Sequence, residues 1–80
     1  MIPSVLIIED EKILSHAMRD YLAHHSYEPV VAGSGEEGLK LLSDSEMDLV
    51  VLDYQLPGMD GIDTLRQIKQ AAPATEVVMV

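Results

Sequence analysis

Short runs of branched apolar residues recur along this chain, and each run is continuous rather than interrupted by polar residues. Such continuity is typical of strands that are covered on both faces, as in a parallel sheet. The predicted strands lie at residues 3–8, 28–32, 48–53 and 77–80. The intervals between them are long enough for one helix each, so we expect strands and helices to alternate.

Helical spacing of apolar residues fills these intervals. The first helix is predicted at residues 12–25, the second after Ser34 and the third after Asp60, a predicted N-cap. Ser34 and Glu37 form a capping-box pattern, in which the Ser34 hydroxyl accepts from the Glu37 amide and the Glu37 carboxylate reaches back. The expected core-facing residues are Ile13, Leu14, Ala17, Met18, Tyr21 and Leu22 in the first helix and Ile62, Leu65 and Ile68 in the third.

The resulting order is strand–helix–strand–helix–strand–helix–strand with short connections. This order calls for a parallel sheet with right-handed crossovers. Pro29 lacks the amide hydrogen that a central strand donates to its neighbour, so the second strand is expected at an edge of the sheet.

Composition limits the function of the chain. Its 80 residues make one domain, and the apolar share of 48% is that of a globular protein. Fourteen acidic and five basic residues give a net charge of −9, which disfavours direct contact with nucleic acid or an anionic membrane. There is no cysteine, no membrane-spanning apolar run and no recognisable secretory signal. We therefore expect a cytoplasmic location and no disulfide or thiolate metal site.

Carboxylates follow two of the predicted strands at the point where each strand ends. Glu9 and Asp10 come directly after the first strand, and Asp53 ends the third. If these strands are neighbours, the three side chains converge, because ligands of open parallel sheets lie beyond the carboxyl ends of the strands. Carboxylates so close together repel one another unless a cation is present, and oxygen ligands of this kind suit Mg²⁺.

Two segments carry a resemblance to a known family. They are VLIIEDE near the start and DLVVLDYQLPGMDGIDTLRQIK further along. Together they resemble the receiver domain of bacterial two-component response regulators, especially receivers of the transcription-factor type. The resemblance covers residues 1–80 and implies a flavodoxin-like three-layer α/β sandwich. It also implies an incomplete, C-terminally truncated domain that lacks a fourth helix, a fifth strand and a fifth helix.

The resemblance gives each acidic residue a role. Asp53 would be the phosphoacceptor. Asp10 would bind Mg²⁺ directly, and Glu9, where many relatives carry aspartate, would act mainly through water. The backbone carbonyl of Gln55 would complete the protein ligands of the metal. Gly61 would lie at the start of the third helix.

The resemblance also implies partners. A phosphohistidine of a sensor histidine kinase would be the phosphoryl donor, and an output domain or downstream protein outside this segment would receive the signal. The chain would modify itself rather than act as a conventional enzyme. Pro57 and Gly58 would shape the turn beside the acceptor.

Two residues of complete receivers have no counterpart here. They are a Ser or Thr at the end of the fourth strand and a Lys at the end of the fifth, and Thr75 and Lys69 are no substitutes because of where they lie in the sequence. The run 77–80 would then be an unpaired apolar edge, which favours a dimer or a domain swap. One flank of the first helix would also lie bare.

Other functions fit less well or remain open. A phosphatase of the haloacid dehalogenase type needs a second aspartate where this chain has Gln55, and no glycine-rich phosphate-binding motif follows the first strand. A receiver fold that serves as a phosphorylation-independent interaction module remains the alternative.

Overall fold

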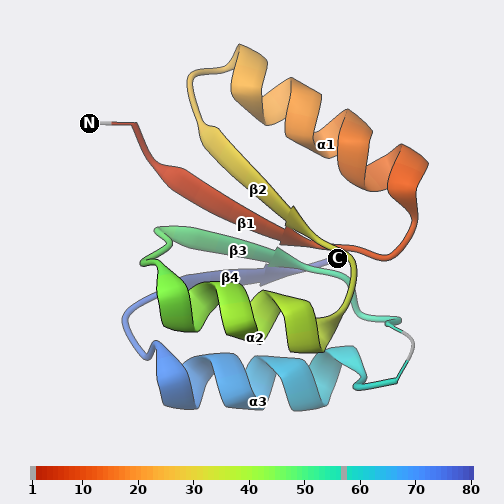
Figure 1. Cartoon of the computed structure of the whole chain (residues 1–80), viewed down its shortest axis with the longest axis vertical. Helices are drawn as coiled ribbons and strands as arrows, with labels where there is room; N and C mark the ends of the chain where they lie inside the picture. Colours follow the sequence, from red (N-terminus) through yellow and green to blue (C-terminus); the bar gives the residue numbers. More distant parts are fainter. Residues whose placement is uncertain (1, 57) are drawn as a thin grey trace.

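The computed structural model describes residues 2–56 and 58–80 and contains every predicted element (Figure 1). In chain order the elements are β1 (Ser4–Ile8), α1 (Lys12–His24), β2 (Glu28–Ala32), α2 (Gly35–Asp44), β3 (Leu49–Leu52), α3 (Gly61–Ala71) and β4 (Glu76–Met79). The predicted alternation is confirmed. Pro57, which was predicted to shape the acceptor turn, lies outside the described residues. Within those residues no helix combines the length and apolar composition needed to cross a membrane.

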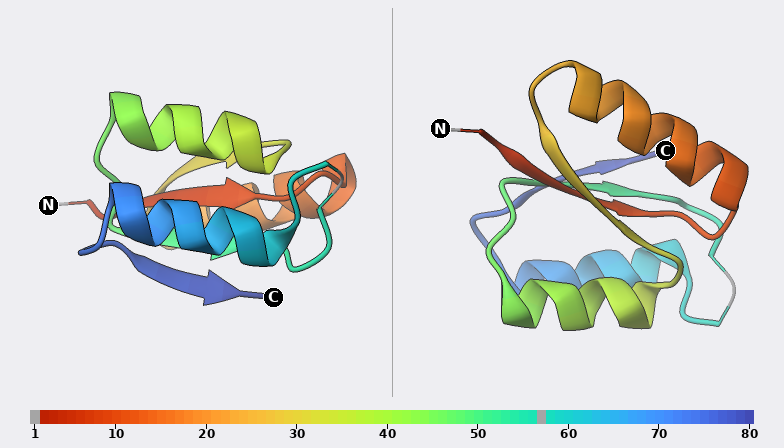
Figure 2. Two further views of the ribbon diagram at one scale, coloured as in Figure 1. Left: turned by 90° about the horizontal axis from the view of Figure 1, so that it is seen from below. Right: turned by 45° about the horizontal axis from the view of Figure 1, so that its top comes forward.

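The four strands form one parallel sheet in the order β2-β1-β3-β4. Strand β2 lies at one edge, as Pro29 predicts, and β4 lies at the other (Figure 2). Helix α1 covers one face of the sheet, and α2 and α3 cover the opposite face (Figure 1). The three-layer arrangement predicted from the sequence is confirmed.

Strand β1 is the centre of the core. Val5, Leu6, Ile7 and Ile8 have no exposed surface, because helices cover both faces of this strand and strands flank both of its sides. The larger cluster lies between the sheet and helices α2 and α3; its buried members are Leu6, Ile8, Ala32, Met47, Val50, Leu52, Leu56 and Ile68. Continuous burial explains why the β1 sequence is apolar throughout rather than alternating.

Helix α1 departs from the sequence prediction. Four of its six predicted core residues are exposed, namely Ile13, Leu14, Ala17 and Tyr21, and the exposed fraction reaches 81% at Ile13 and 66% at Tyr21. Ser15, by contrast, is buried. The helix packs mainly on β2 and β1, so only one of its sides is covered. The Tyr21 ring instead lies beside the His25 ring, with 4.4 Å between their centroids. The predicted bare flank of this helix is thus present, and it includes residues that periodicity alone assigns to the core.

The predicted helix caps are confirmed with one change. The Asp60 carboxylate accepts from the Asp63 amide at 2.9 Å, and the Ser34 hydroxyl accepts from the Glu37 amide at 3.1 Å. The Glu37 carboxylate, however, accepts from the Gly33 amide at 3.4 Å, one residue before the position that a capping box predicts.

Ser26 closes helix α1 in a left-handed conformation with φ of 67°. The Tyr27 amide donates to the Leu22 carbonyl and the Ser26 amide to the Ala23 carbonyl, at 3.0 and 3.4 Å. This is the Schellman pattern of helix ends, whose left-handed residue is usually glycine.

We therefore predict that Ser26→Gly stabilises the chain by about 1 kcal/mol, because glycine carries no Cβ penalty in this conformation. Urea unfolding of the variant and the wild type measures the difference. Ser26→Ala is the control, since it removes the hydroxyl but keeps the Cβ. A glycine variant no more stable than the alanine variant would contradict the prediction.

Candidate functional site

Backbone pairing brings the ends of β1 and β3 side by side. Ile8 pairs with Leu52, and the Asp53 amide donates to the Ile8 carbonyl at 2.9 Å. The next residue of the first strand, Glu9, is held from the other side, because its amide donates to the Ala32 carbonyl at 3.0 Å. The sheet thus fixes the backbone from which the acidic side chains project.

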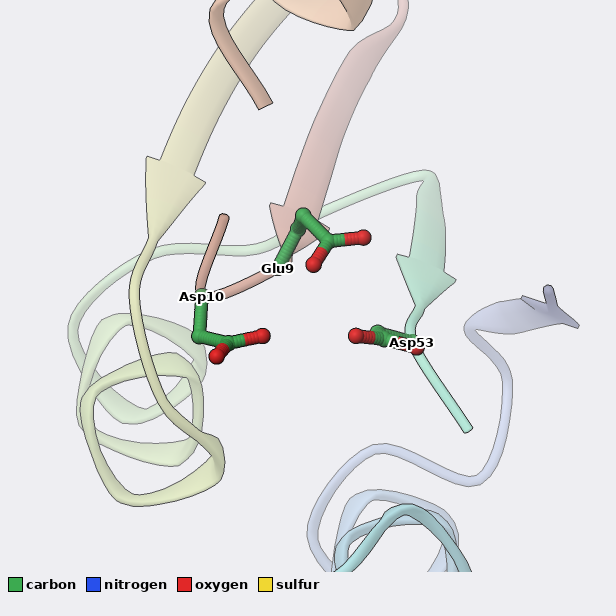
Figure 3. A group of neighbouring side chains, drawn as sticks. All are labelled: Glu9, Asp10 and Asp53. Carbon is green, nitrogen blue, oxygen red and sulfur yellow. The ribbon is translucent and has the colours of Figure 1, made fainter. Parts of the chain in front are cut away.

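The three acidic side chains meet at this edge of the sheet. Glu9, Asp10 and Asp53 each offer a carboxylate oxygen, and these oxygens lie within 4.8 Å of one another. Figure 3 shows the carboxylates of Asp10 and Asp53 facing each other, with that of Glu9 beside them. Glu9 is buried, Asp53 is half-buried and Asp10 is exposed. The cluster is therefore anchored in the protein on the Glu9 side and open to solvent on the Asp10 side.

Glu9 carries the electrostatic strain of this arrangement. Burial raises the pKa of its carboxyl group above the ordinary value of 4.5, and the neighbouring Asp53 and Asp10 raise it further. The Glu11 amide, which donates to Glu9 Oε2 at 3.2 Å, opposes the shift only in part. A cation among the three carboxylates would relieve both the repulsion and the desolvation. Three carboxylates with an open side suit a hard divalent ion such as Mg²⁺, which keeps some of its waters.

The loop that follows Asp53 borders a cavity. The Gln55 amide donates to Asp53 Oδ1 at 3.0 Å and so fixes the carboxylate relative to its own loop. The cavity has a volume of about 560 Å³; it is lined by Asp10, Tyr54, Gln55, Leu56, Asp60 and Ile62. The cavity therefore lies beside the loop that follows Asp53 and reaches Asp10 of the acidic cluster.

Ile62 corrects the sequence prediction for the third helix. It was expected in the buried stripe with Leu65 and Ile68, yet it is 42% exposed and lines the cavity. Ile62 lies in the first turn of α3, but the buried residues of this helix are Gly61, Thr64 and Ile68, so Ile62 lies away from the side that faces the core.

Thr75 and Lys69 donate hydrogen bonds to backbone carbonyls at the opposite end of the sheet from the acidic cluster. Lys69 Nζ donates to the carbonyls of Pro73 and Thr75, at 3.1 and 2.9 Å. Thr75 Oγ1 donates to the Met47 carbonyl at 3.2 Å. Both side chains tie the end of α3 to the start of β4, away from the acidic cluster.

The sequence profile of the response regulator receiver domain matches residues 5–80. The chain belongs to this family. Among characterised proteins this receiver is similar to the transcriptional regulatory protein AfsQ1 of Streptomyces coelicolor, with 43% identity over 68 residues, and to BaeR of Escherichia coli, with 38% over 68 residues. Each alignment covers 85% of this chain but only 30% of AfsQ1 and 28% of BaeR. The chain thus spans less than a third of the length of these relatives.

Solved structures agree with the assignment. The response regulator TrrA of Thermotoga maritima, crystallised in complex with Mg²⁺-BeF, matches with a TM-score of 0.93 and 27% identity, over 98% of this chain and 68% of that one. The N-terminal domain of a response regulator receiver protein from Methanoculleus marisnigri matches with a TM-score of 0.94 and 33% identity, over 99% of this chain and 66% of that one. The predicted flavodoxin-like receiver fold is confirmed.

We predict that Glu9→Gln stabilises the metal-free receiver at neutral pH. The folded chain holds the Glu9 proton more tightly than the unfolded chain does, so the stability that Glu9 contributes is present below pH 4.5 and is lost as pH rises through its raised pKa. The gain from the variant should therefore appear above that range and vanish below it. Mg²⁺ should stabilise the wild type more than the variant, because the variant lacks one anionic ligand.

Thermal unfolding between about pH 4 and pH 8, with and without Mg²⁺, checks both expectations, because this range covers the titration of a carboxyl group whose pKa is raised. Glu11→Gln is the matched control, since it removes the same charge from an exposed residue two positions away. A metal-free Glu9→Gln variant less stable than the wild type at neutral pH would contradict the assignment of strain to Glu9.

Proposed function

We propose that this receiver takes a phosphoryl group from a phosphohistidine of a sensor histidine kinase onto Asp53, with Mg²⁺ held by Glu9, Asp10 and Asp53. The observation that carries the proposal is the meeting of the three carboxylates beyond the ends of β1 and β3. Membership of the receiver family supports the same assignment.

The transfer requires Asp53 to act as a nucleophile. One of its oxygens, Oδ1, accepts from the Gln55 amide, and we assign the attack on phosphorus to Oδ2. As the new O–P bond forms, the P–N bond of the phosphohistidine breaks and its electron pair returns to the imidazole nitrogen. The product is an acyl phosphate on Asp53, which water can later hydrolyse. The protein contributes mainly position, since phosphoryl transfer needs alignment and charge neutralisation above all.

The other residues of the site would position the Mg²⁺ ion beside Asp53. Mg²⁺, when bound, supplies the positive charge that offsets the carboxylates and the incoming phosphoryl oxygens. Asp10 would hold the ion directly, Glu9 mainly through water, and the backbone carbonyl of Gln55 would complete the protein ligands. Tyr54 borders the cavity beside Asp53 and would limit the direction of approach.

The relatives support this chemistry and its setting. TrrA was crystallised with Mg²⁺-BeF, a pairing of the proposed metal with a beryllium fluoride group. AfsQ1 and BaeR are transcriptional regulatory proteins, and LuxN of Vibrio harveyi, 30% identical over 76 residues, is a sensor kinase/phosphatase. We infer that phosphorylation here controls an output domain or a downstream protein through an added charge of about −2. Because ATP supplies the phosphoryl groups of kinases, we place the exchange in the cytoplasm.

We predict that the wild-type chain gains one phosphoryl group when it is incubated with Mg²⁺ and a small donor such as phosphoramidate, and that Asp53→Asn gains none. The amide of asparagine is not nucleophilic enough to replace the carboxylate. Intact-mass spectrometry measures the product, and chelation of Mg²⁺ should abolish it. Asp20→Asn is the matched control, because it removes the same charge from an exposed position on α1.

The same experiment decides between this proposal and the alternative. A wild-type chain that gains no phosphoryl group with Mg²⁺ present would favour a receiver fold used as a phosphorylation-independent interaction module. Modification that persists in Asp53→Asn would instead place the acceptor elsewhere.

We also propose that the chain self-associates through β4, as a dimer or a domain swap. This strand pairs with β3 on one side and forms the edge of the sheet on the other. Val78 and Val80 are 49% and 59% exposed, so the edge offers apolar surface as well as backbone hydrogen-bonding groups.

We predict that Val78→Lys lowers the average mass of the chain in concentrated solution, because a buried lysine charge opposes pairing of this edge. Light scattering over a series of concentrations measures the change. Ile2→Lys is the control, since it adds the same charge at an exposed apolar residue outside β4. A wild-type chain that stays monomeric at every concentration would contradict the proposal.

A further inference from the structure

The first residue of α3 touches the backbone of the acceptor residue. Gly61 is buried, and a Cβ added there would lie 2.8 Å from the Asp53 carbonyl oxygen and 2.6 Å from that of Tyr54. The same Cβ would lie 2.9 Å from the Tyr54 Cα. All three neighbours are backbone atoms, so no side-chain rotation can make room for a methyl group.

Helix α3 also packs closely against helix α2. Thr64, one turn after Gly61, is fully buried, and its hydroxyl donates to the Asp60 carbonyl at 2.8 Å. Helix α2 approaches so closely that a Cβ at Gly35 would collide with Thr64. The N-terminal turn of α3 therefore contacts both α2 and the acceptor loop, and a shift away from the loop would disturb its packing on α2.

The acceptor loop in turn is fastened to the sheet. The Asp53 amide donates to the Ile8 carbonyl, and the Tyr54 amide donates to the Val80 carbonyl at 2.9 Å. The next amide, that of Gln55, holds the Asp53 carboxylate. Any displacement of the peptide between Asp53 and Tyr54 would consequently reorient the amide that fixes the carboxylate.

We propose that Gly61 is a positioning residue, which sets where the backbone of residues 53–55 lies and thereby where the Asp53 carboxylate points. In its link to metal binding and phosphoryl transfer, this inference rests on the proposed function. The fit of Gly61 against backbone carbonyls is a separate observation from the acidic cluster, and it can be tested in the metal-free chain.

The direct test compares three variants of the 80-residue chain by the amide NMR shifts of residues 53–55, without metal. Gly61→Ala should move all three amides. Gly33→Ala adds the same methyl group where the nearest atom, Glu37 Oε2, is 4.0 Å away, and should leave them unmoved. Ile68→Val removes one methyl group from a buried residue of the same helix, two turns after Gly61, and should also leave them unmoved although it lowers stability. Unchanged amides at 53–55 in a folded Gly61→Ala chain would overturn the proposal.

Mg²⁺ titration provides the functional measurement. Gly61→Ala should bind Mg²⁺ about tenfold more weakly than the wild type, as is common when a residue supporting metal ligands is changed. Gly33→Ala and Ile68→Val should bind as the wild type does. If Ile68→Val lost as much Mg²⁺ affinity as Gly61→Ala, the loss in both variants would come from lower overall stability, and the proposal would be overturned. A wild type that binds no Mg²⁺ would refute the proposed function, while the amide shifts would still decide the role of Gly61.

Alanine has a higher helix propensity than glycine, so a Gly61→Ala chain that fails to fold would reflect the steric contact and not helix propensity. Should that variant not fold, the same substitution in the Ser26→Gly background is the second variant. If neither variant folds, the contact is tested in the wild-type chain, where the Hα protons of Gly61 and Tyr54 should show a nuclear Overhauser effect. Its absence would mean that the helix start does not lie on the loop, which overturns the proposal.

Discussion

The parallel pairing of β1 with β3 is the interaction on which the rest of this receiver depends. It places Ile8 beside Leu52, so that the residues following each strand, Glu9 and Asp53, emerge next to each other. Strand β1 is buried on both faces and β3 on one, so neither can shift its register without exposing core residues. A register fixed by hydrophobic burial thus sets the spacing of charged groups at its end.

This spacing holds like charges together at a cost to the metal-free chain. Glu9 is buried beside two other carboxylates, and its raised pKa reflects both burial and repulsion. Burial of the apolar core offsets the free-energy cost of holding these carboxylates together. A divalent cation bound among them would make the same arrangement favourable. The site is therefore most easily understood as one prepared for positive charge, with Asp53 held ready by the Gln55 amide.

The loop after Asp53 links this charged site to the helical layer. It bonds to the sheet through Asp53 and Tyr54, and it meets α3 where Gly61 removes the side chain that would otherwise separate them. The start of α3 is therefore in direct contact with the backbone of the acceptor residue. The close packing of Thr64 against Gly35 extends this contact to α2, so the acceptor, α3 and α2 form one continuous packed unit.

The sequence alone determined the order of the elements, the edge position of β2 and the residues able to form the acidic cluster. Continuous apolar runs, the missing amide of Pro29 and the acidic strand ends are local signals, and each has a local physical cause. The tertiary structure alone decided that Ile13, Tyr21 and Ile62 are exposed, since periodicity gives the apolar side of a helix but not what covers it. It also decided the fit of Gly61 on the acceptor backbone, because contacts between segments distant along the chain depend on how the layers pack.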